Sequence, residues 1–142
     1  KSKIKEQNIL LIKPQTFMNL SGESVQAAMD FYKIPAEQVI VIHDDLDQAF
    51  TELRLHKNRG HGGHNGIRSI HQVLGHADYI RLKLGIGRPP HPEFSVADYV
   101  LQKFSKEEEA LLPSFLDKAV DAIESILFKG YQQSANVFNS KK

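Results

Sequence analysis

Four consecutive β-branched aliphatic residues, Val39 to Ile42, constrain the fold of this 142-residue chain more than any other feature of its sequence. Such residues favour strands, and a run without polar alternation puts apolar side chains on both faces of the strand. Strands of this kind lie at the centre of sheets that helices cover on both sides. The run therefore predicts an α/β fold in which this segment is a central, buried strand.

Alternating and 3.6-residue apolar periods predict further strands and helices along the chain. In chain order these are strand 8–12, helix 21–32, strand 53–56, helix 65–74, strand 80–86 and a helix that begins after Ser105 and ends at Gly130. Ser105 and Glu108 form a capping box for the last helix. This order predicts a single α/β domain over residues 1–142, with a twisted mixed sheet flanked by helices.

Basic residues gather in the middle of the chain. Residues 53–92 contain seven arginines and lysines and six of the seven histidines, against one acid, Asp78. Acidic segments flank this stretch on both sides. Such a distribution suits an anion, with nucleic acid or phosphate as the usual candidates, although an ordinary solvated face explains it equally well.

The composition excludes several classes of protein. The chain has no cysteine, which rules out a disulfide scaffold, a zinc ribbon, an iron–sulfur cluster and thiol catalysis. No apolar run approaches the roughly 18 residues that a membrane helix needs, so we expect no membrane span. The absence of cysteine fits a reducing cytoplasm.

The segment after the first predicted strand carries side chains suited to a ligand. Asn19 offers a carboxamide donor and acceptor, and Met18 offers an adaptable apolar surface. Ligands of open α/β sheets collect at the carboxyl ends of strands, which favours a binding role. A turn and a helix cap made by Ser21 and Gly22 explain the same residues without any ligand.

A second candidate group comes directly after the β-branched strand. It contains one histidine and three aspartates, namely His43, Asp44, Asp45 and Asp47. An aspartate at this place can orient a histidine and stabilise its imidazolium. The group can also bind a cation, or its side chains can cap the backbone of an acidic turn. The residues alone do not separate these three interpretations.

A glycine-rich loop at 60–66 forms the third candidate group. Glycines let a backbone approach a ligand closely, and the N-terminus of the next helix, which we expect Asn65 to cap, favours an anion. His61, His64 and Asn65 could bind phosphate, stabilise an oxyanion or ligate a metal. A flexible loop before a capped helix is the alternative, but two histidines in so glycine-rich a loop favour a functional role.

Four long strings of this sequence occur together, and in the same order, in one protein family. The strings are KPQTFMNLSG (13–22), VIHDDLD (41–47), RGHGGHNGIRSI (59–70) and RLKLGIGRP (81–89). By these strings the chain resembles the bacterial-type peptidyl-tRNA hydrolases. The resemblance covers essentially the whole chain, down to a C-terminal helix.

The resemblance implies a hydrolase that cleaves the ester bond between a peptide and the 3′ ribose of tRNA. Such an enzyme recycles tRNA for translation and takes part in ribosome rescue. The family's fold is an α/β domain with a twisted mixed sheet between helices. The resemblance further implies a cytoplasmic monomer whose partner is peptidyl-tRNA, with no membrane contact, no cofactor and no metal.

Roles for individual residues follow from the same resemblance. Asp44 is expected to orient and polarise the catalytic histidine, and Asn65 to position the attacking water or stabilise the oxyanion. Residues expected to line the crevice near the peptide and the terminal adenosine are Phe17, Met18, Asn19 and His64. Basic residues expected to face tRNA are Arg54, His56 and Lys83.

The family pattern begins with a strand, a glycine–asparagine–proline loop and a segment with the catalytic histidine, none of which is present here. We therefore expect residues 1–142 to form the C-terminal three-quarters of the family domain, without its N-terminal segment and with little or no activity. The alternative function is then a tRNA-binding domain without catalysis. A metal-dependent hydrolase is a third interpretation, and its ligands would be His43, Asp44, Asp47, His61 and His64.

Overall fold

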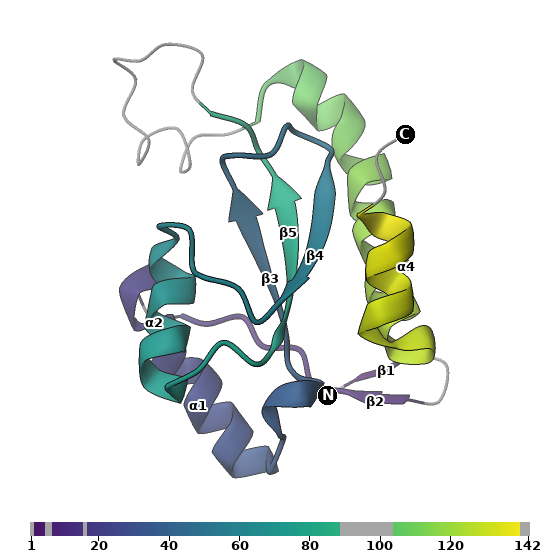
Figure 1. The fold of residues 1–142 in the computed structure, drawn as a ribbon. Helices are drawn as coiled ribbons and strands as arrows, with labels where there is room; N and C mark the ends of the chain where they lie inside the picture. Colours follow the sequence, from purple (N-terminus) through teal and green to yellow (C-terminus); the bar gives the residue numbers. More distant parts are fainter. Residues whose placement is uncertain (1, 5–6, 16, 89–103, 140–142) are drawn as a thin grey trace. The chain divides into compact units, whose positions relative to one another are not determined.

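The computed structural model describes four segments of the chain, residues 2–4, 7–15, 17–88 and 104–139 (Figure 1). The chain forms two compact units. The helical unit consists of residues 1–40 and 57–80, and the sheet unit consists of residues 41–56 and 81–142. Each unit carries its own set of candidate functional residues.

Two helices packed side by side form the body of the helical unit (Figure 1). Its elements are β1 (Ser2–Ile4), β2 (Gln7–Ile9), the 3-10 helix η1 (Met18–Leu20), α1 (Ser21–Tyr32), the 3-10 helix η2 (Ala36–Gln38) and α2 (Asn65–Leu74). The two helices approach closely at Gly22, whose N–H donates to Ser69 Oγ at 2.9 Å. A Cβ atom at Gly22 would clash with the Ser69 carbonyl oxygen. Glycine is therefore required at this crossing.

A three-stranded mixed sheet forms the base of the sheet unit. Its strands are β3 (Ile40–Asp45), β4 (Leu53–Lys57) and β5 (Ile80–Gly85), in the spatial order β3–β5–β4. Backbone hydrogen bonds at both ends of the β3–β5 pair keep the same offset, from Ile80 N to Val39 O and from Ile86 N to Asp45 O. β3 and β5 are therefore parallel, whereas β4 runs in the opposite direction, as the arrows in Figure 1 show.

A long helix, α4 (Lys106–Phe138), packs against the sheet along β4 (Figure 1). The predicted capping box begins it, with Ser105 Oγ accepting from Glu108 N and Glu108 accepting from Ser105 N. Buried apolar residues of this unit are Leu53, Leu55, Leu82, Phe115, Ala119, Ala122, Ile126 and Ala135. No helix within the described segments is long and apolar enough to span a membrane.

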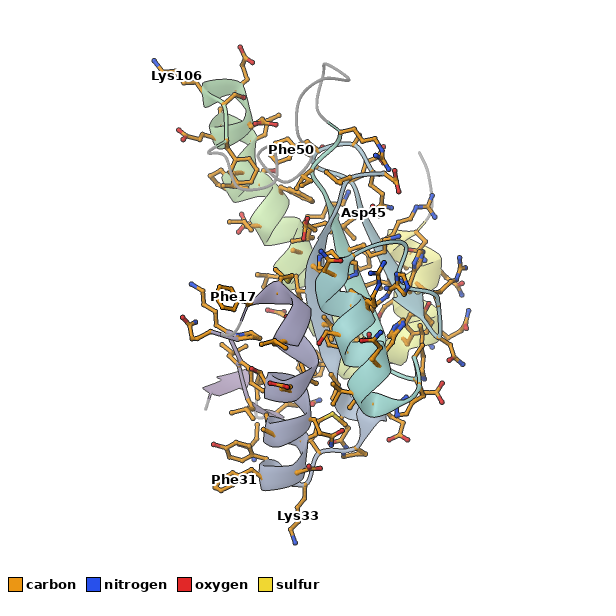
Figure 2. The ribbon with its side chains drawn as sticks, turned by 90° about the vertical axis from the view of Figure 1, so that its left-hand side faces the viewer. Phe17, Phe31, Lys33, Asp45, Phe50 and Lys106 are labelled. Atoms are coloured by element: carbon orange, nitrogen blue, oxygen red, sulfur yellow. The ribbon has the colours of Figure 1, made fainter. Side chains whose placement is uncertain are left out.

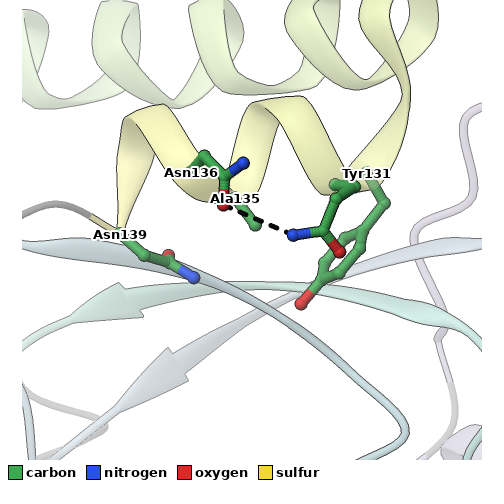
Figure 3. Close-up of a pocket in the computed structure, with 5 residues that line it drawn as sticks. Tyr131, Ala135, Asn136 and Asn139 are labelled. Carbon is green, nitrogen blue, oxygen red and sulfur yellow. Dashed lines mark hydrogen bonds between the residues drawn. The ribbon is translucent and has the colours of Figure 1, made fainter.

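The end of α4 satisfies the outer edge of β4. Asn139 Oδ1 accepts from Leu55 N at 2.8 Å, and Asn139 Nδ2 donates to Leu55 O at 2.9 Å. A carboxamide thus takes the place of a further strand, which shields an edge that could otherwise pair with another chain. Beside this contact lies a pocket of about 370 Å³ (Figure 3), lined by Tyr131, Gln132, Ala135, Asn136 and Asn139.

The polar side chains that line this pocket form hydrogen bonds. Tyr131 Oη donates to Leu55 O at 3.4 Å, and Gln132 Nε2 donates to Asn136 Oδ1 at 3.3 Å (Figure 3). Together with the Asn139 carboxamide, these contacts fix the last turns of α4 on β4. The pocket is therefore part of the anchoring of the helix end.

The β-branched run forms β3, but the prediction of a central strand is wrong. Within the described residues β3 lies at one edge of its sheet, and Ile42 is 50% exposed. The apolar pattern of a strand indicates which of its faces are buried. The place of a strand in a sheet depends instead on hydrogen-bond partners from distant segments.

The predicted buried strand at 8–12 is also wrong. Only Gln7–Ile9 is a strand, and it pairs with β1 in a two-stranded antiparallel ribbon. Leu11 and Ile12, which follow it, are 76% and 47% exposed. A two-stranded ribbon offers little surface for burial, so an apolar run beside it stays exposed.

Helix ends were predicted with mixed success. Gly75 ends α2 in the left-handed conformation, with φ of 76°, as expected. Gly130 breaks the helical backbone of α4 (φ 82°), but the chain resumes its helix up to Phe138. Ser21 is not the N-cap of α1: it is the first helical residue, and its Oγ donates to Met18 O at 2.8 Å.

Candidate functional site

The N-terminus of α2 holds two of the predicted site residues. His64 is the N-cap, and its Nδ1 accepts from Gly66 N at 3.1 Å and from Ile67 N at 3.3 Å. The prediction that Asn65 caps this helix is therefore wrong by one position. An imidazole nitrogen accepts the same backbone hydrogen bonds as the usual Asn or Asp oxygen. Asn65 is then the first helical residue, and it is exposed.

Met18 packs against this same helix end. A Cβ atom at Gly66 would lie 2.7 Å from Met18 Sδ and 3.1 Å from His64 Cε1, so a side chain at position 66 would displace both. Ser21 holds the other side of Met18, through its hydrogen bond to Met18 O and a contact of 3.7 Å with Sδ. The structure thus brings Met18, His64 and the start of α2 together.

The other two predicted residues of the crevice lie beside Met18 in the chain. Phe17 is 82% exposed and Met18 is 57% exposed (Figure 2 labels Phe17). Asn19 is the middle residue of η1, and its side chain lies outside the described part of the structure. An exposed phenyl ring next to a half-exposed thioether is a surface suited to an apolar or aromatic ligand group.

The glycine-rich loop is a defined turn. Gly62 and Gly63 have positive φ angles of 61° and 86°, and Gly63 N donates to His61 Nδ1 at 2.9 Å. Both histidines of the loop therefore use Nδ1 to accept a backbone N–H. Within the described segments, no group of three or more His, Asp or Glu side chains is arranged to hold a metal ion.

Strand register divides the side chains of the sheet unit into two faces. Alternation along β4 puts Leu53 and Leu55 on the buried face, and the pairing of β5 adds Leu82 to it. On the opposite face lie polar side chains from all three strands, namely His43, Asp45, Arg54, His56, Arg81 and Lys83. We call this set the polar sheet face. Asp44, which alternates with its two neighbours, points to the other side of β3.

An ion pair joins two strands on the polar sheet face. Lys83 Nζ lies 2.9 Å from Asp45 Oδ2, and the side chains are only 18% and 12% exposed. Asp45 Oδ1 accepts from Asp47 N at 2.9 Å, so both oxygens of the carboxylate are engaged. Figure 2 shows Asp45 at the end of its strand.

The protonation of Asp45 reflects these contacts. Burial raises the pKa of Asp45, but the hydrogen bonds from Lys83 and from the backbone of Asp47, with the positive charges of Lys83 and His43, lower it more. The pKa of Asp45 therefore lies below its ordinary value. The carboxylate is charged near neutral pH, as its pairing with Lys83 requires.

A second ion pair lies at the same end of the sheet but in solvent. Arg88 Nε donates to Asp47 Oδ1 at 2.8 Å, and the two side chains are 60% and 63% exposed. Water and salt screen such a pair strongly. Two neighbouring acids thus hold two cations in very different surroundings.

Residues 43–47 were predicted to act as one group, but in the structure their side chains have different positions and partners. Asp44 is half-buried and bonded through its carbonyl oxygen to His43 Nδ1 at 2.9 Å. It lies in the sheet unit, whereas Asn65 lies in the helical unit. In β5, Arg81 and Lys83 lie on the same face, as the alternation of the sequence indicates, but Arg81 is buried there at 4% exposure.

Sequence reasoning missed the supporting residues of both units. Ser21 was expected as a helix cap and Gly66 as part of the glycine-rich loop, and neither was expected to support Met18. The pairing of Asp45 with Lys83 was not expected either. One signal was available: β3 carries Asp44 and Asp45, whereas β5 carries Arg81 and Lys83, so the two strands have opposite charges. The register that brings them together has no local signature.

Comparisons with known proteins agree on one family. The sequence profile described as Peptidyl-tRNA hydrolase matches residues 1–142. A peptidyl-tRNA hydrolase of Bdellovibrio bacteriovorus is 58% identical over 139 residues, which cover 98% of this chain and 74% of that protein. One of Geotalea daltonii is 48% identical over 135 residues, covering 95% of this chain and 70% of that protein.

A solved structure shows the same fold. The crystal structure of peptidyl-tRNA hydrolase from Acinetobacter baumannii superposes with a TM-score of 0.80 at 36% sequence identity. The match covers 91% of this chain but only 65% of that protein, so this chain spans less than two thirds of its length. The predicted fold class, an α/β domain with a mixed sheet and helices, is confirmed. The expected lack of an N-terminal segment stays a prediction, since the matches leave part of each relative's own length uncovered.

Proposed function

Because the chain belongs to the peptidyl-tRNA hydrolase family, we propose that it hydrolyses the ester bond between peptide and tRNA in peptidyl-tRNA. The observation that carries this proposal is the family match over residues 1–142, joined to 58% identity with the Bdellovibrio bacteriovorus relative. The comparisons do not support the alternative of a catalytically incompetent tRNA-binding domain.

In the proposed mechanism the helical unit binds the peptide end of the substrate. Phe17, Met18, Asn19 and His64 line the crevice, and the exposure of Phe17 and Met18 supports this role. Asn65 stabilises the oxyanion or positions the attacking water. The helix N-terminus favours negative charge. Since the N–H groups of Gly66 and Ile67 already donate to His64, the hydrogen bond to the oxyanion comes from the Asn65 carboxamide.

The sheet unit supplies the acid and the contacts to tRNA. Asp44 orients and polarises the catalytic histidine, which the family resemblance places outside residues 1–142. That histidine turns water into a nucleophile by taking its proton. Arg54, His56 and Lys83 face the phosphates of tRNA. Their common place on the polar sheet face supports this role, because phosphate contacts depend on charge and not on base sequence.

The remaining proposals follow from this activity. The partner is peptidyl-tRNA, which meets the enzyme through its acceptor end and its peptide. The enzyme acts as a cytoplasmic monomer in translation and ribosome rescue, and we propose no metal or cofactor for the reaction.

The test is hydrolysis of N-acetyl-aminoacyl-tRNA under single-turnover conditions, with and without a chelator. We expect release of the amino acid at a rate that the chelator does not change and that Asn65→Ala lowers. Asp117→Asn, an exposed acid on α4, is the matched control for substitutions of acids. Binding of tRNA without hydrolysis would favour the tRNA-binding alternative, and loss of activity to the chelator would favour a metal-dependent enzyme.

A further inference from the structure

We propose that Asp45 limits the affinity of this protein for tRNA by holding Lys83 in an ion pair, an inference that rests on the proposed function of the polar sheet face. The pair joins β3 to β5, with 2.9 Å between Lys83 Nζ and Asp45 Oδ2. It involves one of the three basic residues that the proposed function assigns to tRNA. Asp45 itself has no assigned role in catalysis.

The geometry fixes the carboxylate in place. Asp47 N donates to the oxygen that Lys83 does not use, so the carboxylate cannot rotate away without losing a hydrogen bond. The two side chains are 12% and 18% exposed, which reduces screening by water. The low pKa of Asp45 is consistent with a carboxylate that stays charged and paired.

Pairing changes what Lys83 can contribute to binding. A cation adds to RNA affinity because its contact with a phosphate releases counterions from the nucleic acid. A phosphate that approaches Lys83 has to compete with a carboxylate already in contact, and it meets the repulsion of that carboxylate as well. Lys83 therefore contributes less to tRNA binding in the wild-type protein than an unpaired lysine would. Removing the charge of Asp45 makes Lys83 available.

The neighbouring pair of Asp47 and Arg88 provides an internal control. Asp47→Asn removes the same charge two residues away, but from a pair whose side chains are 63% and 60% exposed. Solvent already screens that pair, so its cation is open to phosphate without any substitution. A simple effect of net charge would appear equally in both variants.

The experiment is a double-mutant cycle on tRNA binding. Dissociation constants are measured between about 50 and 200 mM salt for the wild type, Asp45→Asn, Lys83→Ala, the double variant and Asp47→Asn. Each phosphate contact changes affinity roughly threefold over this range and changes the slope of log K against log salt by about 0.7 to 0.9. We expect Asp45→Asn to bind tRNA several-fold more tightly, with a slope steeper by about one contact.

Lys83→Ala is expected to lower the slope less in the wild type than in the Asp45→Asn background, where it lowers the slope by about one contact. Lys83→Gln repeats the measurement in case the alanine variant does not fold, and a thermal melt checks every variant. Equal effects of Lys83→Ala in both backgrounds would overturn the inference, as would an equal gain from Asp47→Asn.

Failure of the proposed function gives a different result. If the wild type neither binds nor hydrolyses peptidyl-tRNA, the proposed function is wrong and the inference falls with it. If the wild type binds and hydrolyses its substrate but the cycle is additive, only the inference about Asp45 is wrong.

Discussion

The helical unit and the sheet unit hold their functional side chains by different means. In the helical unit, Met18 and His64 are placed by backbone hydrogen bonds and by glycines that permit close approach, as at Gly66. In the sheet unit, strand alternation and an ion pair place Asp45 and Lys83. Substitutions that change side-chain size should therefore affect the helical unit most. Substitutions that change charge, and changes of salt concentration, should affect the sheet unit most.

The largest effect is expected in the sheet unit. Asp44→Asn keeps the shape of the side chain but removes the charge that stabilises an imidazolium. In a protein that also contains the segment with the catalytic histidine, we expect kcat to fall by roughly two to four orders of magnitude while tRNA binding is retained. Single-turnover hydrolysis and a binding titration measure the two quantities. Loss of binding together with turnover would assign a structural role to Asp44.

The helical unit should be most sensitive at the crossing of its helices. Gly22→Ala puts a Cβ against the Ser69 carbonyl, so α1 and α2 must separate, and we expect a loss of about 1–3 kcal/mol of unfolding free energy. Gly60→Ala is the matched control, since a Cβ there meets no atom within 4 Å. Chemical denaturation measures both variants. Equal stability of the two would show that the helices can move apart freely.

Substitutions of two asparagines distinguish a structural role from a catalytic one. Asn139→Ala leaves the Leu55 N–H without its side-chain acceptor and removes one of the two donors to the Leu55 carbonyl, which should cost about 1–3 kcal/mol of unfolding free energy. Asn65→Ala removes an exposed side chain, and it should change unfolding free energy little while it lowers turnover. Denaturation and turnover are measured on both variants. If Asn65→Ala lowered stability and Asn139→Ala lowered only turnover, the structural and catalytic roles of the two residues would be exchanged.

The smallest effect concerns pH. The folded-state pKa of Asp45 lies below its unfolded value, so the unfolded state binds more protons between the two. The stability contributed by this group is complete above the unfolded pKa of about 3.9 and is lost as pH falls through the folded pKa. Denaturation between about pH 3 and 6 should show this loss in the wild type. Asp45→Asn should be less stable at pH 6 and less dependent on pH, and an identical pH profile would contradict the ion pair.

Features that depend on near neighbours could be predicted from the sequence. The capping box of Ser105 and Glu108, the left-handed stop at Gly75 and the alternation of β4 all appear as expected. Each requires only residues within one or two turns of helix or one strand. The four family strings are local in the same sense, and they predicted the family and its fold class correctly.

Only the tertiary structure decided how these segments combine. Among the described residues, it placed β3 at an edge of its sheet, gave the cap of α2 to His64, buried Arg81 and paired Asp45 with Lys83. The choice between His64 and Asn65 depends on backbone angles that both residues permit. The register of β3 against β5 depends on hydrogen bonds between segments far apart in the chain, and no local pattern encodes that pairing. The sequence by itself therefore determined the family and most of the helices and strands, and long-range packing decided which charges meet.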